Sequence, residues 1–288
     1  TCALPICNPQ SIAFLSDTEI WVTRYDSNEI LVCHPLTGAR TGVVSLSDTL
    51  FPDHTVNPDT DGYLEIAGAL FHNDRIYVAV QRLNRGLAVP GIWGPLGKSY
   101  IAVFDPSSRV LIETIELPYG NPTAGPYYSV ALDRILVVCP GVWQDSSWPE
   151  TIGGGLVAIR PDTHQCEVLA YEFDDGSGSF IHSTGYNGNL NDVAVLSETR
   201  GYLLLTDSSY NASVHYFNPS DGEIDPVPVY ATDGYMLARI LIIGDYLLVA
   251  DRTLTASGIR VFDARTGDPV VATPIPTGAP PTQLTAYR

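Results

Sequence analysis

Short apolar runs alternate with polar turn segments along the whole chain, and they follow a repeated pattern. In each repeat, a first β-run is followed by a polar gap and by a second run that ends in an Asp, Asn, His or Arg corner beside Pro or Ala. A third run follows after a turn. Short apolar runs bounded by turn residues are typical of β-strands, so the pattern predicts strands joined by hairpins.

The pattern occurs five times, and another short apolar run lies upstream of each copy. Each copy therefore predicts a four-stranded antiparallel sheet. One such sheet cannot bury both of its faces, whereas sheets packed radially around an axis do so and leave only short edges. We predict an all-β fold, a β-propeller with five blades, and six blades as the alternative. The equivalent second strands begin at Glu19, Arg75, Arg134, Tyr202 and Tyr246.

The repetition favours a single domain over residues 1–288. The run at 281–288 resembles the first strand of a further unit, as does the run at 8–15. Either the C-terminal run closes the ring against the first unit, or a sixth blade is incomplete. The five units span about 9–48, 63–118, 124–173, 190–230 and 235–276.

Composition agrees with this reading and excludes two classes of partner. Charged residues make up 16% of the chain, while Gly (25) and Pro (22) are plentiful, which suits short strands and tight turns. The formal charge of −17 repels phosphate backbones and anionic lipids, so we expect no nucleic-acid partner. No apolar stretch is long enough to predict a membrane span. We expect a monomer.

Five cysteines are present, and two of them bracket a short segment ahead of the first strand. We predict a disulfide between Cys2 and Cys7, because it would anchor the terminus. We expect Cys33, Cys139 and Cys166 to be reduced and buried. The expected location is secreted, periplasmic or cell-surface, with a signal peptide removed.

The strand-and-turn motifs IRVFDARTG and IAVFDPSS resemble the YVTN and NHL-type propeller repeats. Residues 190–211 are also similar to one blade of the SMP-30/gluconolactonase superfamily. That resemblance implies a Glu, Asn and Asp set near the starts of the inner strands, holding Ca²⁺ or another divalent cation.

The resemblance places candidate metal ligands at Glu65 and Asn191 and a candidate catalytic residue at Asp192. The chain departs from the family where Gln10 stands in place of the usual Glu, and where the fifth unit offers Tyr235. An Asn-Asp pair before a strand is also an ordinary turn element. A structural ion among Asp53, Asp59 and Asp61 is a further alternative.

Two other groups of side chains are candidates for a ligand site. His182 lies in a Gly/Ser-rich loop, where it would serve as a base or ligand. Aromatic residues concentrate in the predicted loops, and beside Asn and Asp they would suit a sugar or a peptide, although packing accounts for most of them. These residues are Trp93, Tyr127, Tyr128, Trp143, Trp148, Phe180 and Tyr186.

The leading functional prediction is a non-enzymatic, extracytoplasmic binding propeller. Its loops and central channel would present a site to a small-molecule, glycan or protein ligand. The first alternative is a divalent-metal-dependent lactonase or hydrolase of the SMP-30 type. The second is an enzyme of unfamiliar chemistry at the channel mouth.

Overall fold

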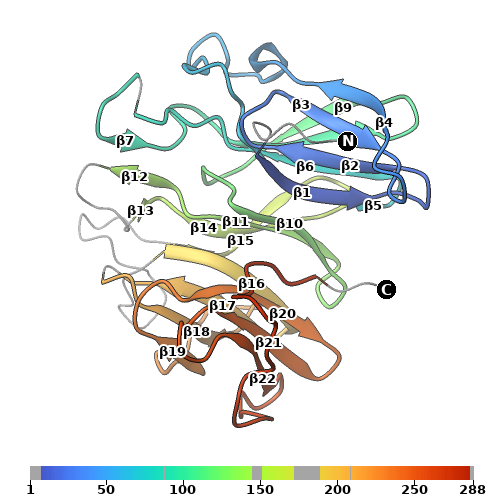
Figure 1. The fold of residues 1–288 in the computed structure, drawn as a ribbon. Helices are drawn as coiled ribbons and strands as arrows, with labels where there is room; N and C mark the ends of the chain where they lie inside the picture. Colours follow the sequence, from blue (N-terminus) through green and yellow to red (C-terminus); the bar gives the residue numbers. More distant parts are fainter. Residues whose placement is uncertain (1–7, 87, 145–150, 172–188, 208, 286–288) are drawn as a thin grey trace. The chain divides into compact units, whose positions relative to one another are not determined.

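The structure is a computed structural model in which the regular elements are antiparallel β-strands and one 3-10 turn, η1 (Asp48–Leu50) (Figure 1). No helix in the described part of the chain is long and apolar enough to cross a membrane. The chain forms two compact units. The structure describes residues 8–86, 88–144, 151–171, 189–207 and 209–285.

The first unit contains two complete four-stranded sheets, each a meander of sequential antiparallel strands. Each central strand is buried on both faces, because its alternate side chains enter two different apolar clusters. In the strand that begins at Arg75, Ile76 and Val78 enter one cluster, while Tyr77 and Ala79 enter the other. The strands are β1 (Pro9–Phe14), β2 (Ile20–Arg24), β3 (Glu29–Cys33), β4 (Arg40–Ser45), β5 (Ile66–His72), β6 (Arg75–Val80), β8 (Tyr100–Asp105) and β9 (Val110–Glu116).

A third four-stranded sheet follows, together with a small sheet built from insertions. The small sheet forms because the chain between β6 and β8 is long enough to carry a strand of its own, which pairs with an insertion of the third sheet. The strands of the third sheet are β10 (Ala124–Ser129), β11 (Arg134–Cys139), β14 (Gly155–Ile159) and β15 (Cys166–Tyr171), and those of the small sheet are β7 (Ile92–Trp93), β12 (Val142–Gln144) and β13 (Thr151–Ile152).

The second unit contains a four-stranded sheet and a three-stranded sheet with a shared apolar core. Tyr202, Val214, Leu247 and Val249 are fully buried in this core. The strands are β16 (Asn189–Ser197), β17 (Arg200–Thr206), β18 (Ala212–Phe217), β19 (Tyr230–Thr232), β20 (Leu237–Ile243), β21 (Tyr246–Asp251) and β22 (Gly258–Asp263).

The fifth sheet lacks the fourth strand that the pattern predicts over 269–275. This segment instead touches β22 through two isolated bridges, Phe262 with Pro269 and Ile259 with Ile275. Pro269 and Pro274 have no N–H group, so a continuous ladder cannot form. Residues 281–285 form no strand, and closure of the ring by the C-terminal run stays a prediction.

The described cysteines confirm the burial prediction in part. Cys33 and Cys139 are buried, with exposed fractions of 3% and 0%. The prediction is wrong for Cys166, which is exposed because it begins β15, at the edge of the third sheet. Burial raises the pKa of the Cys139 thiol.

Candidate functional site

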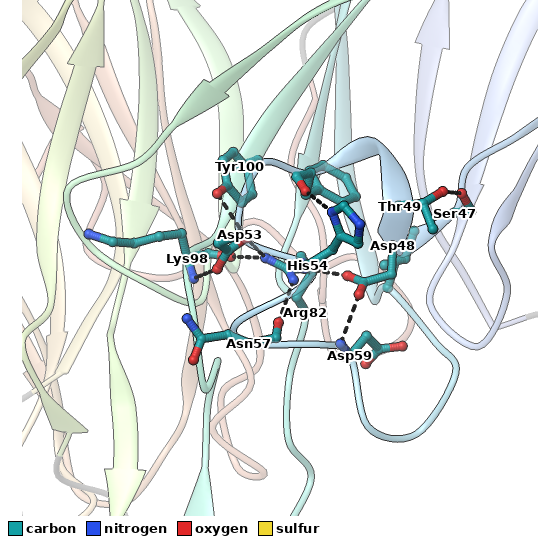
Figure 2. Close-up of polar contacts among 12 residues, drawn as sticks. Ser47, Asp48, Thr49, Asp53, His54, Asn57, Asp59, Arg82, Lys98 and Tyr100 are labelled. Atoms are coloured by element: carbon teal, nitrogen blue, oxygen red, sulfur yellow. Dashed lines mark hydrogen bonds and ion pairs between the residues drawn. The ribbon is translucent and has the colours of Figure 1, made fainter.

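Arg82 lies just beyond the end of β6, and its guanidinium joins distant parts of the first unit (Figure 2). Nε donates to Oδ1 of Asp48 over 2.8 Å, and Nη2 donates to the carbonyl of Asn57 over 2.8 Å. Nη1 donates to Asp53 and to the carbonyl of Lys98. The side chain is only 2% exposed. Arg82 therefore fixes the loop before β5 against the loop before β8.

Asp53 is the second centre of this network. Its carboxylate accepts hydrogen bonds from the Tyr100 hydroxyl (2.9 Å) and from the Lys98 N–H (3.0 Å), besides that from Arg82. Burial opposes ionisation, but these hydrogen bonds and the Arg82 charge hold the pKa of Asp53 below its ordinary value. Asp53 is thus an ionised anchor for Arg82.

A buried amide shapes the loop that follows Arg82. Asn84 is 1% exposed, and its Nδ2 donates to the carbonyls of Val89 (3.0 Å) and Ile92 (2.6 Å). Its Oδ1 accepts from the N–H groups of Ala88 (2.8 Å) and Val89. One side chain therefore replaces the backbone pairing that the loop lacks.

A second arginine, Arg85, carries three further ion pairs. Nη1 lies 3.1 Å from Asp26, and Nε lies 3.3 Å from Asp61. The guanidinium also lies over the rings of Tyr25 and Tyr63, at 5.1 and 5.5 Å from their centroids. Such cation–π contacts add stabilisation where the cation is partly desolvated.

Glu65, a predicted metal ligand, lies directly before β5 and is fully buried. Oε2 accepts from the N–H of Leu83 over 2.7 Å, and Oε1 lies 2.7 Å from Nη2 of Arg85. Burial raises the pKa of Glu65 to about 8, while the Leu83 N–H and Arg85 act in the opposite direction. Both oxygens are engaged within the protein, so an ion would have to displace one of these partners.

The acidic residues of the preceding loop have different environments. Asp53 is held by Arg82, and Asp61 by Arg85. Burial, reinforced by the charges of Asp61 and Asp48, raises the pKa of Asp59 to about 6. Nowhere in the described residues do three or more His, Cys, Asp or Glu side chains group so as to hold a metal ion.

Asn191, the other predicted ligand, belongs to β16 in the second unit. Its Nδ2 donates to the Thr206 hydroxyl (2.7 Å) and to the Asn189 carbonyl (3.1 Å). Its Oδ1 accepts from the hydroxyl of Tyr235 over 3.3 Å. Tyr235 in turn is bound by Arg252, whose Nη2 donates to its carbonyl over 2.7 Å. Asn191 and Arg252 thus both contact Tyr235, one at its hydroxyl and the other at its carbonyl.

Asp192 is buried, and its Oδ2 accepts from the N–H of Ile240 over 2.9 Å. Its Oδ1 lies 3.8 Å from Arg239. These contacts join β16 to β20, so the environment of Asp192 is that of a structural carboxylate. A catalytic role for it stays a prediction.

The predicted aromatic residues fall into different settings. Trp93 in β7 is 48% exposed, and its backbone pairs with that of Trp143 in β12. Tyr127 is exposed, and Tyr128 stacks on His72 with ring centroids 3.7 Å apart. Outside the described residues lie Trp148, Phe180, His182, Tyr186, Cys2 and Cys7.

The loops joined by Arg82 expose apolar side chains and enclose a small pocket. We call residues 47–63, 81–86 and 88–98 the loop platform. The pocket has a volume of ≈ 10 Å³, room for about one water molecule. It is lined by residues 57–60, 82–84, 96 and 97. The exposed apolar residues of the platform are Leu50, Val56, Tyr63, Val89, Trp93 and Leu96.

The sequence indicated Asp53, Asp59 and Asp61 as candidate residues in this region, but no motif in it pointed to Arg82, Asn84 or Arg85. A lone arginine matches no motif. The available signal was the sequence QRLNR directly after an apolar strand, because a polar, doubly basic segment beside a buried strand needs acidic partners.

Comparison with known proteins shows the fold alone. No protein-family model matches the chain, and no curated protein matches its sequence. Among solved structures, a chain of a nidogen/laminin complex is similar with a TM-score of 0.53 and 11% identity, over 95% of this chain and 82% of that one.

Two further structures give the same result. The PQQ-bound aldose sugar dehydrogenase of Streptomyces coelicolor has a TM-score of 0.56 and 12% identity, over 94% of this chain and 81% of that one. The Dos1 propeller has a TM-score of 0.51 and 13% identity, over 94% of this chain and 59% of that one. The successive antiparallel sheets and these similarities identify the chain as an all-β propeller, with a sheet count consistent with five blades.

Proposed function

We propose that the chain is a non-enzymatic, extracytoplasmic binding propeller whose loop platform engages a protein ligand. The observation that carries the proposal is the Arg82 network, which holds two long loops in one fixed arrangement. A rigid surface binds with a smaller loss of conformational entropy than mobile loops do. Fixed loops on a propeller scaffold are therefore suited to recognition.

The exposed side chains of the platform support a protein ligand. Val56 is 78% exposed, and Trp93 and Tyr63 are 48% and 42% exposed. Exposed apolar side chains that gather on one surface and are rimmed by polar groups are typical of protein interaction sites. The formal charge of −17 favours a partner with a basic surface, because opposite charge speeds encounter.

The structural neighbours include a protein–protein complex as well as an enzyme. One is a nidogen/laminin complex, and another is a sugar dehydrogenase. The lactonase alternative draws no specific support from the geometry, since both oxygens of Glu65 are engaged by Leu83 and Arg85.

The test is selection of binders from a random peptide library displayed on phage, using the wild-type protein as bait. Enriched peptides are then measured by isothermal titration calorimetry against the wild type, Trp93→Ala and Val56→Asp. We expect basic peptides. Trp93→Ala should raise Kd by about 10–30-fold, because a central aromatic contact contributes about 2 kcal/mol. Val56→Asp should also raise Kd, because the cost of burying a hydrated carboxylate in an apolar contact outweighs its added attraction to a basic peptide.

The matched control is Tyr246→Ala, which removes an aromatic ring of similar exposure (50%) from the second unit. It should leave Kd unchanged. The proposal is wrong if no peptide is enriched, or if Trp93→Ala and Val56→Asp bind the enriched peptides as tightly as the wild type does.

A further inference from the structure

Asn84 forms hydrogen bonds with the backbone on both sides of Trp93. Its Nδ2 donates to the carbonyl of Ile92 over 2.6 Å, and its backbone N–H donates to the carbonyl of Gly94 over 2.8 Å. Trp93 itself lies in β7, where its backbone pairs with that of Trp143 in β12. The backbone of Trp93 is therefore fixed at both of its neighbours, and one residue makes both contacts.

The remaining hydrogen bonds of the Asn84 amide lie inside the same loop. Nδ2 also donates to the carbonyl of Val89, and Oδ1 accepts from the N–H groups of Ala88 and Val89. An asparagine amide has two N–H donors and two acceptor lone pairs, so its full capacity is used within the loop. Because Asn84 is only 1% exposed, it acts on the conformation of the loop and not on a ligand directly.

The ring of Trp93 lies close to the backbone of the same loop and is still accessible. A Cβ atom at Gly86, where φ is +71°, would lie 3.2 Å from Nε1 and 3.5 Å from Cε2 of Trp93. The tryptophan is nevertheless 48% exposed, so part of the ring is open to a ligand. An aromatic side chain that is already held in its bound orientation loses little conformational entropy on binding.

We propose that Asn84 is a positioning residue for ligand binding, which holds Trp93 in the orientation in which its ring contacts the protein ligand. The inference rests on the proposed function, because Trp93 belongs to the loop platform. It goes further by making the affinity contributed by an exposed ring depend on a buried amide. Without that amide the indole is still present, but it samples several orientations, and binding must select one of them.

The first measurement needs no ligand. The four tryptophans are replaced by 5-fluorotryptophan, and the fluorine NMR signal of Trp93 is assigned by its loss in Trp93→Phe. In Asn84→Ala, this signal should narrow and move toward that of free 5-fluorotryptophan, while the signal of the fully buried Trp21 stays unchanged and shows that the fold is intact. Asn84→Asp keeps the side-chain shape, loses both Nδ2 donors and gives the same test if Asn84→Ala does not fold. An unchanged Trp93 signal overturns the proposal.

The second measurement is a double-mutant cycle on the Kd of a selected peptide, determined by isothermal titration calorimetry. Asn84→Ala should raise Kd about fivefold when Trp93 is present and less than about twofold in the Trp93→Ala background. In the matched Val56→Asp background, the effect of Asn84→Ala should remain about fivefold. Equal effects with and without Trp93 would overturn this inference and leave the binding function standing, because general damage to the fold weakens both backgrounds alike. Failure to select any peptide would overturn the proposed function itself.

Discussion

Nε of Arg82 lies 2.8 Å from Oδ1 of Asp48, although 34 positions separate the two residues in the chain. The arginine is almost fully buried, while the aspartate is 22% exposed. The side chains of Arg82 and Asp53 thereby hold together two loops that no strand pairing joins in the described part of the chain. The stability of the first unit should depend on this contact more than on any exposed ion pair.

Arg82→Met should lower the free energy of unfolding by about 3–5 kcal/mol, because it leaves Asp48 and Asp53 without their cation. Urea unfolding monitored by tryptophan fluorescence measures the change. The control is Arg265→Met, which breaks an exposed pair with Asp245 and should cost less than about 1 kcal/mol. Equal losses in the two variants would show that the Arg82 network does not stabilise the protein.

Stability should also depend on pH through Asp59. Its pKa is about 6 in the folded state against an ordinary value of 3.8, so the folded protein holds this proton more tightly than the unfolded chain does. Its contribution to stability is therefore greatest below about pH 4 and is lost as pH rises to about 6. At pH 7, Asp59→Asn should raise the free energy of unfolding by about 1 kcal/mol, after allowance for solvent screening.

The measurement is urea unfolding of the wild type and Asp59→Asn between pH 4 and pH 7, where the two curves should diverge. The exposed Asp162→Asn serves as the control and should follow the wild type. Parallel pH profiles for the wild type and Asp59→Asn would mean that Asp59 titrates as it does in the unfolded chain.

The fit of the two loops also depends on Gly97. A Cβ atom there would lie 2.2 Å from Oδ2 of Asp53 and 2.6 Å from Cβ of Asn57. Gly97→Ala should force the loops apart, cost about 1–3 kcal/mol and speed limited proteolysis within 47–63. Gly278→Ala tests backbone strain without a clash, since φ is +76° there and no atom lies within 4 Å. Gly278→Ala should leave the rate of cleavage within 47–63 unchanged. If Gly97→Ala is also cleaved there at the wild-type rate, the contact at Gly97 is not tight.

The three described cysteines should differ in reactivity. Cys166 is exposed and should be alkylated in the native protein. The reaction should be slower than that of a fully solvated cysteine, because partial desolvation of the thiol raises its pKa. Cys33 and Cys139 should react only after unfolding. Mass mapping of alkylated peptides measures this and also tests the predicted Cys2–Cys7 disulfide. Native labelling of Cys139 ahead of Cys166 would contradict the structure.

The sheets were predictable because a strand buried on both faces reads as an uninterrupted apolar run. In β6, β8 and β11 the sequence shows such runs directly. The apolar run at 224–230, which ends the fourth unit, predicts the last strand of that sheet, but the strand forms at Tyr230–Thr232. Pro226 and Pro228 in the predicted run have no N–H group to donate a hydrogen bond to the neighbouring strand. The apolar character of the run was therefore not enough to make it a strand.

The candidate site was less predictable, because its contacts join residues far apart in the chain. The Asp53–Tyr100 hydrogen bond spans 47 positions, and the Asp192–Ile240 hydrogen bond spans 48. Composition does not say which acidic residue meets which arginine. Cys166 shows the same limit, because its exposure depends on β15 lying at the edge of the sheet.

The proposed binding surface is tested most directly by hydrogen–deuterium exchange with and without a saturating concentration of a selected peptide. Ligand binding should slow the exchange of backbone amides in residues 47–63 and 88–98 and leave β20 to β22 unchanged, because contact and ordering protect the amides they cover. Protection confined to the second unit, or absent from both loops, would contradict the account.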